Sequence, residues 1–230
     1  MLYKFVENQF MESFFNSGNL RLGTILDFND VVKHGTARGD SKEGQHIVFR
    51  SVREVKLKEG KQEPLVSELF HVTGDREIIM ENFSVAAQRR CNNGFLFCTS
   101  NEYTDSLFRR WNSEVKADAC YQILNPRGFY YEISKVIRNS ISEYRCKNVV
   151  YTKDPIPYDS PHAQENPAFT KEESEFSWQK ENRCVWNPLL PPIKLKPWII
   201  EVPEARKYCR PFKLWNSGSI KDHPVILDTV

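Results

Sequence analysis

One short segment in the last quarter of the chain has the residue types and spacing that could do chemistry. Gln179, Glu181 and Arg183 stand at every second position. If this segment is a strand, successive side chains point to opposite faces, so these three share one face. An amide and a carboxylate would then project into one site. A carboxylate held beside a developing positive charge stabilises a cationic transition state, so Glu181, with Gln179 on the same face, is the candidate catalytic group.

Two other segments could complete a site for an anionic ligand. Residues 95–100 form a compact apolar run that closes on hydroxyl residues, which indicates a buried strand with polar groups at its end. The chain opens on Leu-Tyr-Lys-Phe, and a Leu-Arg-Leu-Gly-Thr segment follows one predicted helix later. These stretches supply the candidate ligand-binding residues, which are Tyr3, Lys4, Arg21, Thr24, Thr99 and Ser100.

The order of these segments resembles a bacterial family of domains of unknown function that occurs in phage-defence loci and is similar to ADP-ribosyltransferases. The matching stretches are residues 2–30, 94–135 and 169–186. The sequence departs from the broader pattern at two positions, because Lys4 stands in place of an Arg and Cys98 in place of a Ser.

The resemblance implies an NAD-dependent ADP-ribosyltransferase, acting as a toxin or phage-defence effector on RNA, DNA or protein, with an antitoxin as a further partner. Glu181 would hold a ribose hydroxyl and favour the oxocarbenium state, and Gln179 would position the acceptor. Tyr3 would lie near nicotinamide, and Arg21 or Lys4 would pair with the pyrophosphate. The implied fold is α+β, a single domain over residues 1–230, with two small mixed or antiparallel sheets around a cleft and flanking helices.

Hydrophobic periodicity predicts the elements that must position these residues. We expect a long polar loop over residues 27–45 and a hairpin that joins residues 46–58 to residues 65–73. Residues 78–83 add a strand or begin a helix. The last clear strand is at residues 197–202. Further strands are expected at residues 2–6, 20–26, 95–100, 119–124, 146–151 and 176–186, and helices at residues 8–17, 102–111 and 128–141.

Composition excludes several classes of protein. The 230 residues carry 32 basic and 30 acidic side chains, so no global charge favours nucleic acid. No apolar run approaches the roughly 20 residues of a membrane span, and the N-terminus is too polar for a signal peptide, so we expect a cytoplasmic protein without a membrane partner. The six cysteines lack zinc spacing and are expected to be reduced. No metal site is predicted, and His34 is the one histidine in the polar loop.

Two alternatives stay open at this point. One is a non-enzymatic interaction module with a degenerate cleft that binds RNA or a protein, using the basic and aromatic residues of segment 193–215. The other is a metal-dependent nuclease, which needs clustered carboxylates. The only such group in the sequence is Asp27, Asp30, Asp40 and Glu43.

Overall fold

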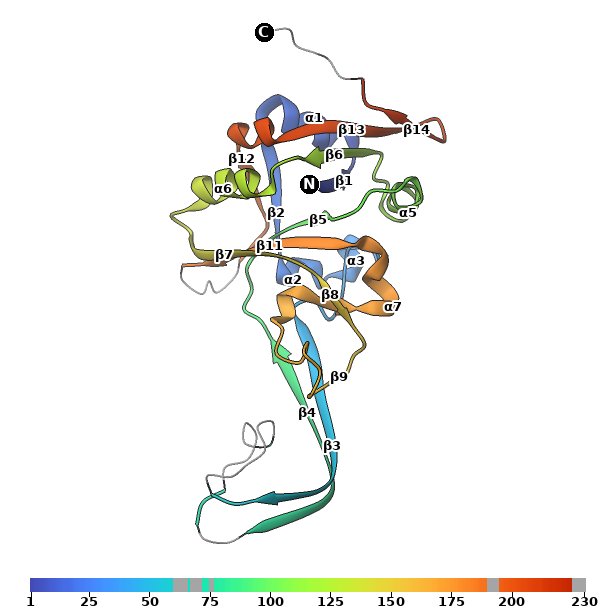
Figure 1. Ribbon diagram of the computed structural model, residues 1–230. Coiled ribbons are helices and arrows are strands. Elements are labelled where there is room, and N and C mark those ends of the chain that lie inside the picture. Colours follow the sequence, from blue (N-terminus) through green and yellow to red (C-terminus); the bar gives the residue numbers. More distant parts are fainter. Residues whose placement is uncertain (60–65, 67–71, 75–76, 190–194, 225–230) are drawn as a thin grey trace.

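The computed structural model describes residues 1–59, 66, 72–74, 77–189 and 195–224. The fold is mixed α+β, and most of its strands pair antiparallel. Nine strands form the main sheet, and Figure 1 shows β13, β6, β1, β5 and β11 in that order from top to bottom. The bounds of the main-sheet strands are β1 (Leu2–Val6), β2 (Asn19–Thr24), β5 (Phe95–Ser100), β6 (Ala119–Ile123), β7 (Ile141–Asn148), β11 (Glu181–Pro188), β12 (Trp198–Glu201), β13 (Cys209–Asn216) and β14 (Ser219–Asp222).

Strand β5 is the point at which this sheet divides. Along one edge it pairs with β11 over its whole length. On the other edge it pairs with β1 only at Ser100, opposite Tyr3, and with β2 only at Phe95 and Leu96. Strand β1 then continues with β6, β13 and β14, while β2 continues with β12. The expected two small sheets are therefore two branches of one sheet that share β5.

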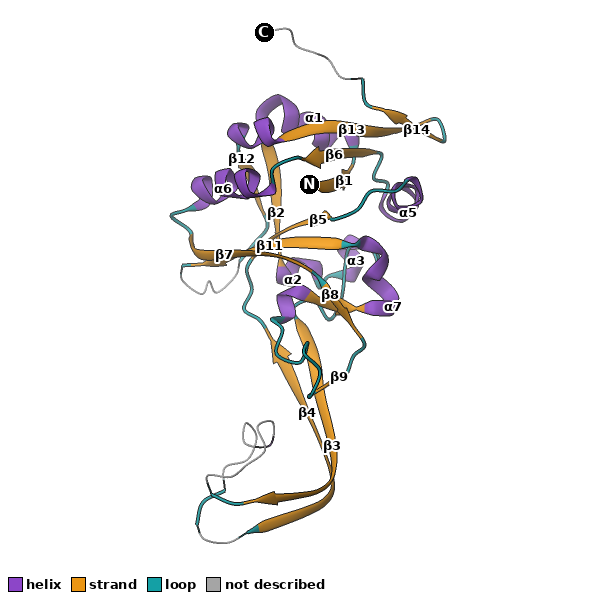
Figure 2. Ribbon diagram, in the orientation of Figure 1, coloured by secondary structure: helices purple, strands orange, loops and turns teal. Residues whose placement is uncertain are grey.

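Helices cover both faces of the β1 branch because its side chains alternate. Leu2 and Val6 face a core packed under α1 (Asn8–Ser17) and α6 (Pro126–Ile137). Tyr3 and Phe5 face a second, aromatic core under α5 (Asp105–Val115). Figure 2 shows these three helices around the upper strands. Further helices are α2 (Ile25–Phe28), α3 (Val31–His34) and α7 (Glu173–Phe176), with 3-10 turns at Pro167–Phe169, Ser177–Gln179 and Pro203–Tyr208.

A long hairpin of β3 (Gln45–Leu57) and β4 (Ile78–Arg90) extends away from the rest of the molecule (Figure 1). The sequence analysis placed the partner strand at residues 65–73, most of which lie outside the described residues, and the observed partner is β4. Short β9 (Ile156–Pro157) lies parallel to β3, and β8 (Val150–Thr152) pairs in parallel with β10 (Thr170–Glu172). The expected last strand at residues 197–202 is followed by β13 and β14, which the periodicity missed.

Two cysteines on neighbouring strands correct the expectation of six reduced thiols. Cys146 on β7 and Cys184 on β11 are directly opposed and joined by a disulfide. The four other cysteines are free thiols, namely Cys91, Cys98, Cys120 and Cys209. Within the described residues, every helix is too short or too polar to cross a lipid bilayer.

The end of helix α1 gives a test of the packing. Gly18 has φ +82°, and a Cβ there would lie 2.5 Å from the backbone nitrogen of Pro203. We expect Gly18→Ala to lower the free energy of unfolding by about 2–4 kcal/mol, because backbone strain and overpacking add. Gly218 is the matched control, since it has φ +80° with nothing within 4 Å of its Cβ position. Gly218→Ala should cost only about 1 kcal/mol, and equal losses in urea denaturation would contradict the close approach.

Candidate functional site

A cavity of about 610 Å³ opens where β5 loses its strand partners. Residues 97–99 of β5 lie between the short contacts with β1 and with β2, and β11 forms the opposite wall. Six Lys or Arg side chains and two Glu side chains line the cavity, so basic side chains outnumber acidic ones in its lining. These charged residues are Lys4, Glu7, Arg21, Lys33, Arg38, Lys171, Glu181 and Arg183.

The three predicted strand segments lie in neighbouring strands and converge on this cavity. Tyr3 and Glu181 are both paired with Ser100, from opposite edges of β5. At one strand spacing each, they lie about 10 Å apart across the sheet. Two residues far apart in the sequence are therefore held at one site by backbone pairing.

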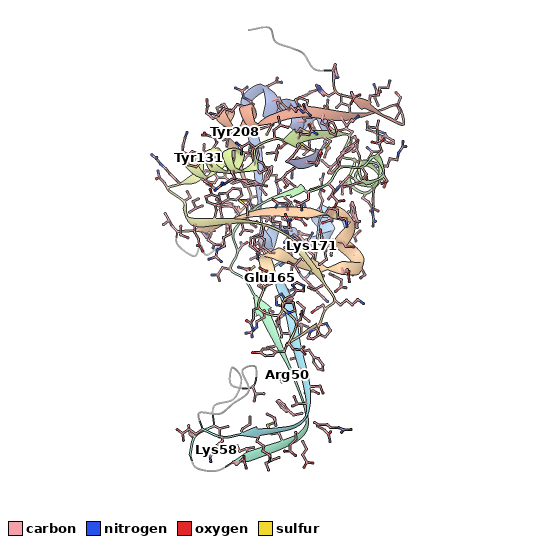
Figure 3. The ribbon with its side chains drawn as sticks, viewed as in Figure 1. Arg50, Lys58, Tyr131, Glu165, Lys171 and Tyr208 are labelled. Atoms are coloured by element: carbon pink, nitrogen blue, oxygen red, sulfur yellow. A yellow bond between two sulfur atoms is a disulfide. The ribbon has the colours of Figure 1, made fainter. Side chains whose placement is uncertain are left out.

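A buried ionic network forms the floor of the cavity. Arg183 donates through Nε to Glu181 Oε1 at 2.8 Å and through Nη2 to Glu43 Oε2 at 2.8 Å. Lys171 Nζ lies 3.1 Å from Glu181 Oε2. All four side chains are at most 6% exposed. Figure 3 labels Lys171 in the middle of the molecule, beside β11. Two carboxylates and two cations thus compensate one another out of contact with water.

The network keeps Glu181 ionised. Burial by itself raises the pKa of Glu181, but Arg183 and Lys171 oppose burial and lower that pKa to about 2. Burial raises the pKa of Glu43, against the same two cations. Glu181 therefore stays ionised at neutral pH, paired with Arg183 and Lys171.

Gln179 differs from its expected place in a strand. It ends a 3-10 turn, and Lys180, with φ +49°, reverses the backbone before β11 begins at Glu181. Both ends of the Gln179 amide are occupied, because Nε2 donates to Ala37 O at 2.6 Å and Oε1 accepts from Lys171 Nζ at 3.1 Å. The amide therefore fixes the loop around Ala37 and the position of Lys171.

The hydroxyl residues of β5 make bonds within the protein. Ser100 Oγ donates to Gln179 O at 2.9 Å, and Thr99 Oγ1 donates to Asn182 O at 3.1 Å. Both residues line the cavity, but their hydroxyls join β5 to the chain on the β11 side. Their observed contacts support the wall of the site.

Tyr3 and Thr24 take places outside the centre of the cavity. The Tyr3 ring lies 5.7 Å from the ring of Tyr103 and 5.9 Å from that of Phe212, in the aromatic core under α5. Thr24 Oγ1 accepts a hydrogen bond from Asp27 N at 3.0 Å and so caps α2. The structure thus brings Glu181, Gln179, Lys4, Arg21, Thr99, Ser100 and Tyr3 to the cavity lining and leaves Thr24 out of it.

Lys4 reaches into the gap between the branches of the sheet. Its Nζ donates to Cys98 O at 2.6 Å, which satisfies a β5 carbonyl at the stretch without a strand partner. The same ammonium lies 4.5 Å from the centre of the Phe97 ring. Burial, opposed by Cys98 and Glu181 and aided by the nearby Arg38, lowers the pKa of Lys4 to about 8.

A second ionic cluster surrounds Asp27 at the rim. Arg21 Nη2 lies 2.6 Å from Asp27 Oδ2, Lys33 Nζ lies against Oδ1, and His34 Nε2 lies 3.1 Å from Oδ2. Burial would raise the pKa of Asp27, but hydrogen bonds from Lys33 and Arg21 lower it. Arg21 therefore brings its charge to the cavity together with a bound carboxylate. The described residues contain no group of three or more His, Cys, Asp or Glu that could hold a metal ion.

Sequence reasoning gave Lys171 no role and considered Glu43 only as an acid of the polar loop. Lys171 stands ten residues before Glu181 with no spacing that suggests a contact, and Glu43 is 140 residues from Arg183. One feature of the sequence could have identified Glu43. It precedes Gly44 and the start of a strand, and a charged residue at such a position suggests that the chain packs closely against the rest of the protein. No protein-family model, curated protein or solved structure matches the chain.

The pKa of Glu181 predicts how stability depends on acid. The folded-state pKa of about 2 lies below the ordinary value of 4.5. The ionised Glu181 therefore makes its full contribution to the free energy of unfolding above pH 4.5, and this contribution is lost as the pH falls toward 2. The loss attributable to Glu181 is at most about 3 kcal/mol. Glu181→Gln should therefore flatten the decline of the unfolding free energy between pH 5 and pH 3. Glu114→Gln, on the exposed face of α5, should leave the decline unchanged, and a Glu181→Gln curve parallel to the parent would contradict the ionised network.

Proposed function

We propose that the protein is an NAD-dependent ADP-ribosyltransferase and that Glu181 is its catalytic carboxylate. The observation that carries the proposal is a buried, ionised Glu181 at the floor of a basic cavity. A dinucleotide needs cations for its two phosphates and a negative group beside the ribose from which nicotinamide leaves. The cavity lining offers both, and its volume falls within the range of small-molecule sites.

The proposed reaction follows from these charges. The bond between the ribose carbon and the pyridinium nitrogen breaks, and its electron pair leaves with neutral nicotinamide. The ribose becomes an oxocarbenium ion, which Glu181 stabilises more strongly than the ground state. The acceptor's nucleophilic atom then bonds to the ribose carbon, and its proton passes to solvent. Arg183 and Lys171 hold the carboxylate oxygens in place, at 2.8 and 3.1 Å.

Gln179 has a positioning role in this proposal. Its amide is engaged by Ala37 and Lys171, so its effect on transfer would pass through those residues and not through a bond to the acceptor. The fold supports the comparison with ADP-ribosyltransferases only in outline, through a divided antiparallel sheet with the cavity at the division. On the resemblance, we propose a macromolecular acceptor and a role as a toxin or phage-defence effector.

One observation favours a second candidate, a binding module without catalysis. Glu181 is 5% exposed, and both of its oxygens already accept from cations. A carboxylate so compensated would hold the floor of a nucleotide site without acting on the ribose. Within this second candidate, RNA is the less favoured partner, because the aromatic residues Phe212 and Trp215 pack against the core under α5.

Nicotinamide release and melting temperature together test the proposal. NAD should raise the melting temperature by mass action, and Glu181→Gln should keep most of that shift because it retains the shape of the side chain. The same substitution should slow nicotinamide release by about 10²–10³-fold, the usual cost of removing one preorganised group.

The exposed variant Glu114→Gln should match the parent in both measurements. If NAD raises the melting temperature but the parent releases no nicotinamide, the binding module takes the place of the enzyme. If Glu181→Gln releases nicotinamide as fast as the parent, Glu181 is not the catalytic carboxylate.

A further inference from the structure

Arg38 differs from every other basic residue of the cavity in having no bonded partner. It follows α3 in the turn that leads to β3, is partly buried, and lines the cavity. Within the described part of the chain, no carboxylate lies in ion-pair contact with Arg38 and no acceptor is hydrogen-bonded to it. The five others are engaged: Arg183 and Lys171 by Glu181, Arg21 and Lys33 by Asp27, and Lys4 by the carbonyl of Cys98.

The charges around Arg38 compensate its guanidinium only in part. Burial lowers the pKa of Arg38, Glu7 opposes this from beyond ion-pair distance, and Arg21 lowers the pKa further. Lys4 also repels Arg38. A partly buried guanidinium that faces two other cations is stabilised by an anion placed among them.

The backbone on each side of Arg38 is fixed. Before it, Ala37 is buried and its carbonyl accepts from Gln179 Nε2 at 2.6 Å. After it, Gly39 N donates to Gly35 O at 2.8 Å and Asp40 N donates to Phe28 O at 2.9 Å. The side chain thus projects from an anchored turn, which reduces the ordering cost of binding a ligand.

We propose that Arg38 is the phosphate-binding residue of the cavity and that it takes the diphosphate group of a nucleoside diphosphate moiety. The proposal rests on the proposed function for the choice of a dinucleotide, but the diphosphate subsite stands on the geometry of Arg38 itself. A guanidinium binds phosphate oxygens through two parallel N–H donors. Arg21 and Lys4, the residues expected for this role, have donors committed to Asp27 and to Cys98. Gln179 supports the subsite through Ala37.

Calorimetric binding of ADP, adenosine and NAD tests the subsite without relying on turnover. We expect the parent to bind ADP and NAD, and Arg38→Gln to weaken both by about 10–100-fold. Binding of adenosine, which lacks phosphate, should change less than 3-fold. Arg38→Lys should fall between the two, because it keeps the charge and loses the two-pronged geometry. Arg53→Gln, on the exposed part of β3, is the matched control and should bind ADP like the parent.

Each outcome either supports or overturns the diphosphate subsite at Arg38. None of the described residues is bonded to Arg38, so Arg38→Gln should melt at the parent's temperature without ligand. If its melting temperature falls, Arg38→Lys repeats the binding test. ADP binding that Arg38→Gln leaves intact, or a parent that binds neither ADP nor NAD, would overturn the proposal. Binding of ADP that depends on Arg38, without any release of nicotinamide from NAD, would uphold the diphosphate subsite and reject the transferase.

Discussion

The site depends on the burial of one guanidinium group. Arg183 is 1% exposed in its side chain, and such a charge is tolerated only when carboxylates and carbonyls satisfy it. Glu43 comes from the loop after α3, Glu181 from the same strand, and the third acceptor, Ala168 O at 2.7 Å, from the turn before β10. Three segments that share no sheet register are therefore held together by Arg183, and removing one carboxylate typically costs about 3–5 kcal/mol.

A sheet that divides at β5 explains where the cavity lies in the fold. Wherever strands separate, backbone groups lose partners and must be satisfied in another way. Here the ammonium of Lys4 bonds to the carbonyl of Cys98 in the gap. The ammonium that donates to this carbonyl also adds a positive charge to the lining of the gap.

Much of the strand framework could be predicted from the sequence, because β1, β5 and β6 carry apolar runs of the right length. The site was harder. Alternation placed Gln179 in a strand, but Lys180 adopts a left-handed conformation that periodicity does not reveal. Lys171 and the disulfide partner Cys146 are fixed by tertiary pairing alone, and single-sequence patterns carry no signal for such contacts. Strand β13 was missed because Pro211 and a bulge before Lys213 interrupt its pattern.

The long hairpin has a consequence for cooperativity. Its base packs on the body through Val48, Val85 and Ile156, but Val55, Leu57 and Val66 form a separate buried cluster further along the hairpin. Strand β9 pairs with Val48 and Phe49, and beyond them the described residues of the hairpin pair as a two-stranded ribbon. Two small cores joined by a ribbon are free to open at different temperatures. Amides at the distal end would then exchange with solvent through local opening, while the body around Arg183 stays closed.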